Sequence, residues 1–465
     1  MAARAEAQVS PLTGGDTVKR TIIRGGLVIA APPAAPNSGA TDILIEGSRI
    51  IALGENLAAH DAEEIDAVGR IIIPGLVNAH MHTWQSGLRG VSADWNLLEY
   101  LVWIHGAAAP LYTEADLHVG TLAGALNQIA CGTTTLGDWC HNAATPGHAD
   151  AAVEALTDAG IRAVFFHGVP RGGGPHDAGP HPATEVDRLL AKPAFADDGL
   201  LTLGLAAPGP LYSPFDVAQA DLSLARDRGL VISMHHSGGP PCPPEVWTRL
   251  FDQGLLGPHA NFVHANQIDA DLLKRLIDVG VSFTITPEVE LNDGHGFPIT
   301  GKLRALGAAP SLGIDIETGI SGELLIAARV ALAHVRGQDY EAFRAAPDDP
   351  PPARLTAGDA LAWATIEGAR ALGLQDRIGS LEPGKQADLV MIDARALNLW
   401  PNNDPTAMAL QASLANIEAV MIGGVWRKQA GRLLYGALDS LRVELEASGA
   451  RIAAAANLPI RRLQA

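Results

Sequence analysis

Short apolar runs that end in a polar residue recur along most of the chain, and they constrain its fold more than any other feature. Eight such runs occur, and segments of helical pattern separate most of them. The runs are 70–80, 132–139, 160–168, 200–209, 229–236, 260–265, 281–288 and 310–316. Strands buried on both faces read as continuous hydrophobic runs, and helical crossovers make them parallel. The pattern therefore predicts an α/β fold, a (β/α)8 TIM-type barrel.

The two ends of the chain have a different pattern. Residues 18–70 and 379–434 combine β-branched alternation with frequent glycines, which is typical of short antiparallel strands. We predict that both ends build one small β-sandwich-like domain, with the barrel inserted between them. The predicted boundaries are 1–70 and 376–435 for the two parts of this domain, 71–375 for the barrel and 436–465 for a C-terminal helix.

The charge balance and the cysteine content exclude several classes of protein. The 465 residues include 33 Lys and Arg but 51 Asp and Glu, and the net charge of −18 has the wrong sign for binding nucleic acid or an anionic membrane. The chain has three cysteines and no apolar run of the roughly 18 residues that a membrane span needs. We expect a cytoplasmic protein whose partner is a small molecule, with no nucleic-acid or membrane partner.

Histidines and an aspartate stand at the ends of several predicted strands. His80 and His82 form a His-x-His pair, and both rings project to one face because strand side chains alternate. His235 ends the fifth run and Asp315 lies in the eighth, and in a barrel these strand ends face the same mouth. Imidazole and carboxylate groups in this number suit a catalytic metal with one position left open for water.

Two long motifs, DAVGRIIIPGLVNAHMH (66–82) and GSLEPGKQADLVMID (379–393), carry a resemblance to a known family. Together with the histidines of ISMHH and FVHA and the aspartate of SLGID, they resemble the amidohydrolase superfamily. Within it, the chain is similar to the cytosine-deaminase-like and s-triazine-hydrolase-like branch. The resemblance covers nearly the whole chain.

This resemblance implies a set of metal ligands and their roles. The implied ligands are His80, His82, His235 and Asp315, with His264 polarising the substrate. Binuclear relatives need a lysine at the end of the fourth strand, and run 200–209 has none, so we expect one divalent metal. Zinc is favoured, with cobalt, manganese and iron as alternatives. Asp315 is placed to take a proton from the attacking water and return it to the leaving nitrogen, while His264 stabilises the oxyanion.

The chain also departs from the pattern of its branch. Deaminases there usually have a glutamate three residues after the fifth-strand histidine, and this chain has Gly238. Glu288 or Glu290, in the unusual segment 286–296, is an alternative source of that carboxylate. A chain that keeps the framework of the branch but lacks this glutamate in its pocket resembles the phenylurea and thiocarbamate hydrolases of the branch. We therefore predict hydrolysis of a non-peptide carbon–nitrogen bond in a small amide, urea or carbamate. Deamination of a purine, pyrimidine or related ring is the alternative, and a non-catalytic scaffold is the remote one.

Other polar residues near the predicted mouth are candidates for substrate contact. We place Trp84, His141, His167 and Glu288 in this group. The remaining histidines considered are expected to be structural or exposed, namely His105, His118, His148, His176, His181, His259 and His295. Barrels of this size often pair through their outer helices, so a homo-oligomer is expected.

Overall fold

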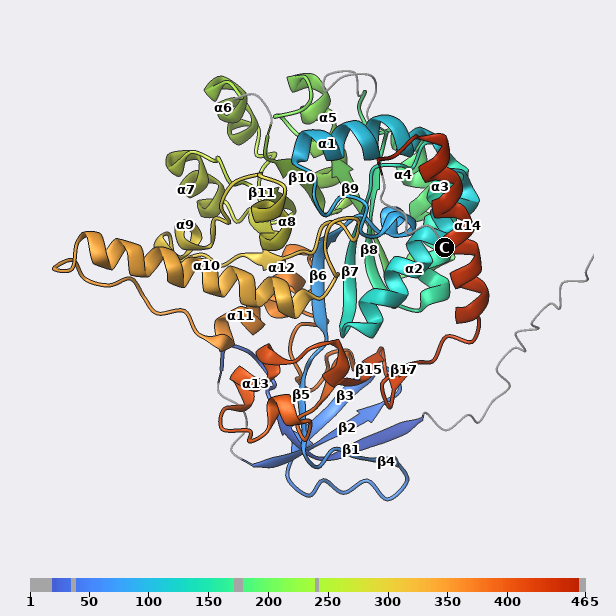
Figure 1. Cartoon of the computed structure of the whole chain (residues 1–465), viewed down its shortest axis with the longest axis vertical. Helices are drawn as coiled ribbons and strands as arrows, with labels where there is room; N and C mark the ends of the chain where they lie inside the picture. Colours follow the sequence, from blue (N-terminus) through green and yellow to red (C-terminus); the bar gives the residue numbers. More distant parts are fainter. Residues whose placement is uncertain (1–18, 35–38, 171–178, 239–241, 460–465) are drawn as a thin grey trace, which may run out of the picture.

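The computed structural model describes residues 19–34, 39–170, 179–238 and 242–459. Its larger part is an eight-stranded sheet in which all neighbouring strands pair in parallel (Figure 1). The strands are β6 (Leu76–Met81), β7 (Thr133–Cys140), β8 (Arg162–Gly168), β9 (Leu201–Ala207), β10 (Ile232–His236), β11 (Ala260–His264), β12 (Ser282–Ile285) and β13 (Ser311–Leu312). Backbone hydrogen bonds from Asp315 N to His80 O (3.0 Å) and from His82 N to Asp315 O (2.8 Å) close the sheet into a barrel. The predicted barrel is confirmed.

Helices alternate with the strands and surround the barrel, as the alternating sequence pattern requires. They are α2 (Glu114–Ala130), α3 (Pro146–Ala159), α4 (Ala183–Leu190), α5 (Phe215–Arg228), α6 (Pro244–Asp252), α7 (Ala270–Asp278), α8 (Pro287–Asn292), α9 (Thr300–Ala305), α10 (Leu324–Ala345), α11 (Ala357–Trp363) and α12 (Ile366–Ala371). Thr113 and Asp269 cap α2 and α7 by accepting hydrogen bonds from backbone N–H groups of the first turn. Before α2, the segment α1 (Leu97–Tyr100) and the π-helical η2 (Leu101–Ala108) cross the mouth of the barrel.

Both chain ends contribute to a second, mixed sheet below the barrel in Figure 1. Its strands are β1 (Arg20–Val28), β2 (Ala40–Glu46), β3 (Arg49–Gly54), β4 (Glu63–Asp66), β5 (Arg70–Pro74), β14 (Leu389–Asp393), β15 (Ile417–Ile422), β16 (Val425–Gln429) and β17 (Arg432–Leu433). Strand β5 joins the two halves, because it pairs with β1 on one side and with β14 on the other. The chain ends therefore form one composite β-domain, as the sequence pattern predicts.

The first apolar run, 70–80, is divided between the two sheets rather than forming one barrel strand. Its first half is β5 and its second half is β6. Gly75 lies at the crossing, where its N–H donates to the Asp388 carbonyl (3.0 Å). A Cβ at this position would lie 2.0 Å from Thr134 Oγ1, so no larger residue fits between the sheets. Apolar residues continue on both sides of Pro74 and Gly75, so the hydrophobic pattern does not reveal the break.

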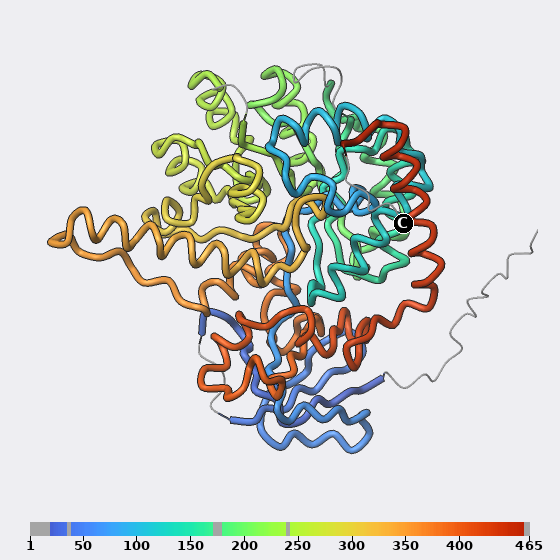
Figure 2. The backbone as a smooth tube through the Cα atoms, viewed as in Figure 1, coloured from blue at the N-terminus to red at the C-terminus, as the bar shows by residue number. Residues whose placement is uncertain are grey.

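The C-terminal helix α14 (Leu438–Ala455) packs along α2 on the side of the barrel (Figure 2). Ser448 Oγ donates a hydrogen bond of 2.6 Å to Asp116 Oδ1, and Arg451 forms an ion pair with the same carboxylate. Gly449 allows α14 to approach the backbone of Gly87 closely, because a Cβ at position 449 would lie 2.2 Å from the Gly87 carbonyl oxygen. None of the helices in the described part of the chain has the length and apolarity that a membrane span requires.

Candidate active site

The candidate site lies at the carboxyl ends of the barrel strands. His80, His235 and His264 lie at or next to the last residues of strands β6, β10 and β11, and Asp315 follows β13. The backbone of His264 and Asp315 is left-handed, with φ of 72° and 66°. Such angles are unfavourable for residues with a side chain, and they cluster where a fold holds functional groups in place. The strand ends thus bring together residues that are far apart in sequence.

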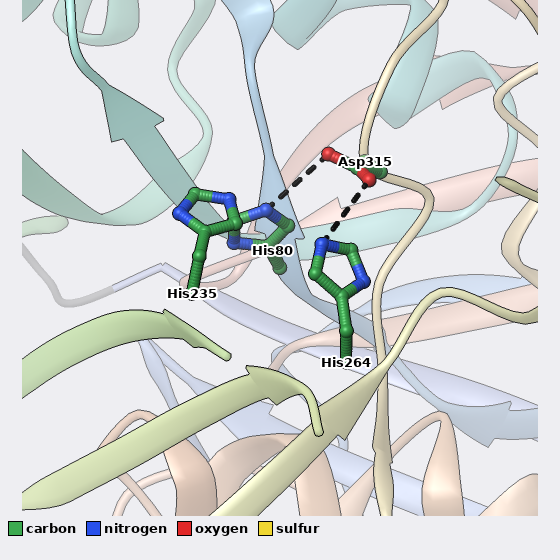
Figure 3. Close-up of side chains that lie close together, drawn as sticks. All are labelled: His80, His235, His264 and Asp315. Carbon is green, nitrogen blue, oxygen red and sulfur yellow. Dashed lines mark ion pairs between the residues drawn. The ribbon is translucent and has the colours of Figure 1, made fainter. Parts of the chain in front are cut away.

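The side chains of these four residues converge on one point (Figure 3). One ligand atom from each of His80, His235, His264 and Asp315 lies within 4.8 Å of all the others. Asp315 Oδ1 is 3.3 Å from His80 Nε2, and Asp315 Oδ2 is 3.7 Å from His264 Nε2. Three imidazoles and one carboxylate at this spacing form a group that can hold a metal ion.

The chemical state of these residues fits a metal. His80 is fully buried, its Nδ1 has no hydrogen-bond partner within the described structure, and its Nε2 faces Asp315. Burial lowers the pKa of His80 to about 4, so its imidazole is neutral at pH 7, as a ligand must be. Burial alone would raise the pKa of Asp315, but contacts with His80 and His82 hold that pKa well below its usual value. The ionised carboxylate of Asp315 and the neutral imidazole of His80 are thus in the states that binding of a cation requires.

His82 lies beside this group. Its Nε2 is 3.2 Å from Asp315 Oδ1, and its Nδ1 is 2.6 Å from the carbonyl oxygen of Trp139. A carbonyl can only accept, so Nδ1 of His82 donates to Trp139, which leaves Nε2 as the ring nitrogen that faces Asp315. The predicted ligand set and the four converging residues thus share His80, His235 and Asp315, and they differ in whether His82 or His264 completes the set.

Two polar groups hold the ring of His264 from behind. Its Nδ1 is 3.4 Å from Glu290 Oε1 and 3.1 Å from Thr286 Oγ1. Burial alone would lower the pKa of His264, but Glu290 and Asp315 reverse the effect and raise that pKa. Glu290 is itself buried and accepts a hydrogen bond of 2.9 Å from Thr286 N. Glu290 therefore acts on His264, and it does not line the cavity.

A small cavity of about 70 Å³ opens directly above the converging residues. Its apolar wall includes Leu97 and Leu101 from α1 and η2, Val289 from α8, and Ile316. Its polar wall includes Asp293 and several imidazoles in addition to Asp315. The site thus combines a candidate metal centre with a cavity that has both apolar and hydrogen-bonding surfaces.

The four residues expected to contact substrate lie in different places. His141 lines the cavity, and Trp84 lies behind it, donating from Nε1 to His141 Nδ1 at 3.2 Å. His167 lies outside the lining, where its carbonyl accepts a hydrogen bond of 2.9 Å from His181 Nε2. Glu288 also lies outside it, on the side of α8 near Glu323 and Arg329, and burial raises its pKa to about 7.

Sequence reasoning missed several residues that do line the cavity. His105 and His295, which were expected to be structural or exposed, both belong to its wall, and so does Asp293. They come from η2 and from the turn after α8, in loops that follow β6 and β12. The unusual segment 286–296 was the one available signal, because it departs from the pattern of the branch.

Comparison with known proteins identifies the family. The model of the amidohydrolase family matches residues 71–241 and 261–427. The chain belongs to the amidohydrolase family. It is therefore an enzyme of the hydrolase class, as the sequence motifs predict.

Curated relatives of this amidohydrolase are deaminases. The chain is 32% identical over 422 residues to a 5-methylthioadenosine/S-adenosylhomocysteine deaminase of Symbiobacterium thermophilum, covering 85% of this chain and 90% of that protein. It is 28% identical over 469 residues to an 8-oxoguanine deaminase of Pseudomonas aeruginosa, covering 95% and 99% of the two chains.

Solved structures with the same fold include an atrazine chlorohydrolase of Arthrobacter aurescens in complex with zinc. The match has a TM-score of 0.78 and 22% identity, and it covers 92% of this chain and all of that one (100%). An adenosine deaminase of Xanthomonas campestris with bound zinc matches with a TM-score of 0.77 and 23% identity over 93% and 98% of the two chains. At this level of identity the matches establish the fold.

Proposed function

We propose that this amidohydrolase removes an amino group from a small nitrogen heterocycle by hydrolysis, using one divalent metal ion, with zinc favoured. The observation that carries the proposal is the convergence of three imidazoles and Asp315 beneath a small cavity. The deaminase activity named for the two curated relatives supports an amino group as the leaving group. The proposal therefore favours deamination over the amide, urea or carbamate hydrolysis that the sequence motifs suggested first.

We assign the metal ligands as His80, His82, His235 and Asp315. This assignment follows the His-x-His pattern that the family resemblance implies: Trp139 holds Nδ1 of His82 and leaves its Nε2 toward Asp315, whereas Glu290 and Thr286 hold His264 from behind. When bound, a divalent metal acidifies water and polarises the carbon under attack. Asp315 takes a proton from the attacking water and returns it to the leaving nitrogen. His264, held by Glu290, donates to the oxygen on which negative charge develops.

A second candidate keeps the original prediction of amide, urea or carbamate hydrolysis. It is favoured by Gly238, which brings no carboxylate to the cavity, and by the apolar wall that Leu97 and Leu101 form. The two candidates differ in the leaving product, which is ammonia for the first and an amine for the second.

The expectation of a homo-oligomer is independent of both candidates, and size-exclusion chromatography with light scattering tests it.

The test uses purified, zinc-loaded protein and two panels of compounds. Ammonia release is measured with 8-oxoguanine, adenine, guanine and 5′-methylthioadenosine, and amine release is measured with anilides, phenylureas and thiocarbamates. We expect ammonia from at least one ring and no amine from the second panel. The opposite result would establish the second candidate.

Metal content measured by mass spectrometry tests the ligand assignment. We expect His80→Ala and His82→Ala to lose the metal, and His264→Ala to retain it while losing activity. Loss of metal in His264→Ala with retention in His82→Ala would reverse the assignment of these two residues.

A further inference from the structure

Hydrolytic deamination needs two groups that move protons, and only one has been assigned so far. This inference rests on the proposed function. As water adds to the carbon of a ring amidine, the electron pair of the C=N bond moves onto the ring nitrogen, which must receive a proton. Asp315 cannot supply this proton, because it is engaged with the proton of the attacking water. A second acid must therefore face the ring.

Asp293 is the remaining carboxyl group in the cavity wall. Among the described residues that line the cavity, Asp293 and Asp315 are the only ones with a carboxyl group. Asp293 is the C-cap residue that follows helix α8, and it is 3% exposed. Its Oδ1 accepts a hydrogen bond of 2.9 Å from Asn292 Nδ2, and no other hydrogen bond to its carboxyl group is present in the described structure. Oδ2 thus remains available to a ligand.

Several contacts place Asp293 beside the strand end that lacks a carboxylate. Leu97 N donates to the Asp293 carbonyl at 2.9 Å, and a Cβ on Gly238 would lie 2.9 Å from Leu97 Cδ2. His295 Nδ1 is 3.2 Å from Ser237 Oγ, and the ring centroids of His295 and His264 are 4.5 Å apart. The turn after α8 therefore contacts Ser237 and His264 directly, and Leu97 connects it to Gly238.

The backbone at Gly238 explains why the acid comes from elsewhere. Its φ is +70°, which disfavours any residue with a side chain, and Leu97 already fills the space that a side chain would enter. A carboxylate at position 238 would require both the backbone and Leu97 to move. The same part of the cavity receives a carboxyl group from Asp293 instead.

The protonation state of Asp293 suits an acid that works near neutral pH. Burial raises its pKa to about 6, against the opposing effect of the Asn292 hydrogen bond. Nearby Asp315 raises the pKa further, whereas His264 lowers it. A group with a pKa in this range can both give and recover a proton during one turnover.

We propose that Asp293 is a catalytic residue that protonates the ring nitrogen of the substrate. Its O–H bond breaks as the N–H bond forms, and the water oxygen bonds to the carbon. Asp315 then transfers the water's proton to the amino group. As the C–N bond breaks and ammonia leaves with its electron pair, the new hydroxyl gives its proton to Asp293 and becomes a carbonyl. Both carboxyl groups thereby return to their starting states, and the products are a lactam and ammonia.

The experiment compares two substitutions of this residue in the zinc-loaded enzyme. Asp293→Asn preserves the shape and an N–H donor but cannot give up a proton, whereas Asp293→Ala removes both. We expect kcat for ammonia release to fall at least about 100-fold in either variant. Binding of purine, which has no amino group to lose, is measured by calorimetry. Its Kd is expected to rise about tenfold in Asp293→Ala and to stay within about threefold in Asp293→Asn.

Controls separate this proposal from loss of the metal, from misfolding and from failure of the proposed function. Zinc content should equal that of the wild type in both variants, and Asp278→Asn, on the surface of α7, should leave kcat and purine binding unchanged. Asp293→Asn with kcat within about threefold of the wild type would overturn the proposal, and so would unchanged purine binding in Asp293→Ala. If the wild type releases no ammonia, the proposed function fails, and the purine measurement still decides whether Asp293 contacts the ring.

Discussion

The buried ion pair between Arg162 and Asp388 should stabilise the junction of the two domains strongly. Arg162 begins barrel strand β8, and Asp388 precedes β14 of the β-domain. Arg162 Nε donates to Asp388 Oδ2 at 2.7 Å, and a second guanidinium nitrogen donates to Oδ1 at 3.1 Å. Both side chains are 2% exposed. Removing one partner leaves the other as an uncompensated buried charge, which costs about 3–5 kcal/mol.

We therefore expect Arg162→Met and Asp388→Asn each to lower the free energy of unfolding by about 3–5 kcal/mol. The double variant should lose less than the sum, with a coupling energy of about 2–3 kcal/mol, because neither charge is then left alone. Asn at 388 keeps an acceptor for Gly423 N, which now donates to Asp388 Oδ1 at 2.6 Å.

Urea unfolding followed by tryptophan fluorescence measures these values, provided that refolding curves superimpose. Arg188→Met is the matched control, because the Arg188 side chain that pairs with Asp150 and Glu185 is 35% exposed, so its ion pairs should contribute at most about 1 kcal/mol. A loss below about 1 kcal/mol in Arg162→Met, or simple additivity in the double variant, would refute the reasoning.

Three further predictions concern burial, close packing and the metal. The pKa of Glu288 is raised to about 7 from an ordinary 4.5, so its ionisation destabilises the fold as pH rises through this range. Glu288→Gln should therefore raise the free energy of unfolding by up to about 3 kcal/mol at pH 8 and leave it unchanged at pH 4. Equal urea midpoints for the wild type and the variant at pH 8 would contradict this. Gly75→Ala should cost about 1–3 kcal/mol in the same assay, because the new Cβ would lie 2.0 Å from Thr134 Oγ1, and a neutral effect would show that the sheets separate easily. Zinc at 100 times its Kd should stabilise the metal-free protein by about 2.7 kcal/mol, which is measured as a rise in Tm. This rise should be absent in His80→Ala. The same rise in that variant would show that zinc binds at another site.

The barrel strands were predictable because parallel strands buried on both faces must be apolar throughout. The residues at their ends were predictable for a related reason, since the carboxyl ends of all eight strands open to one mouth. His80, His235 and Asp315 could thus be grouped without knowing any distance. The hydrophobic pattern did not predict the division of run 70–80, because apolar residues continue from β5 into β6. Only the pairing distinguishes the two strands, since β5 pairs with β1 and β14 whereas β6 pairs with β7.

The cavity wall was decided by the tertiary structure. His105, Asp293 and His295 lie in segments without a repeating pattern, and their positions depend on how α1, η2 and the turn after α8 pack over the barrel. The sequence by itself determined the strand count, the composite β-domain and the candidate metal residues, because each follows from periodic burial or from the direction of a strand. Which carboxyl groups line the cavity depends on contacts between loops, and no local pattern encodes such contacts.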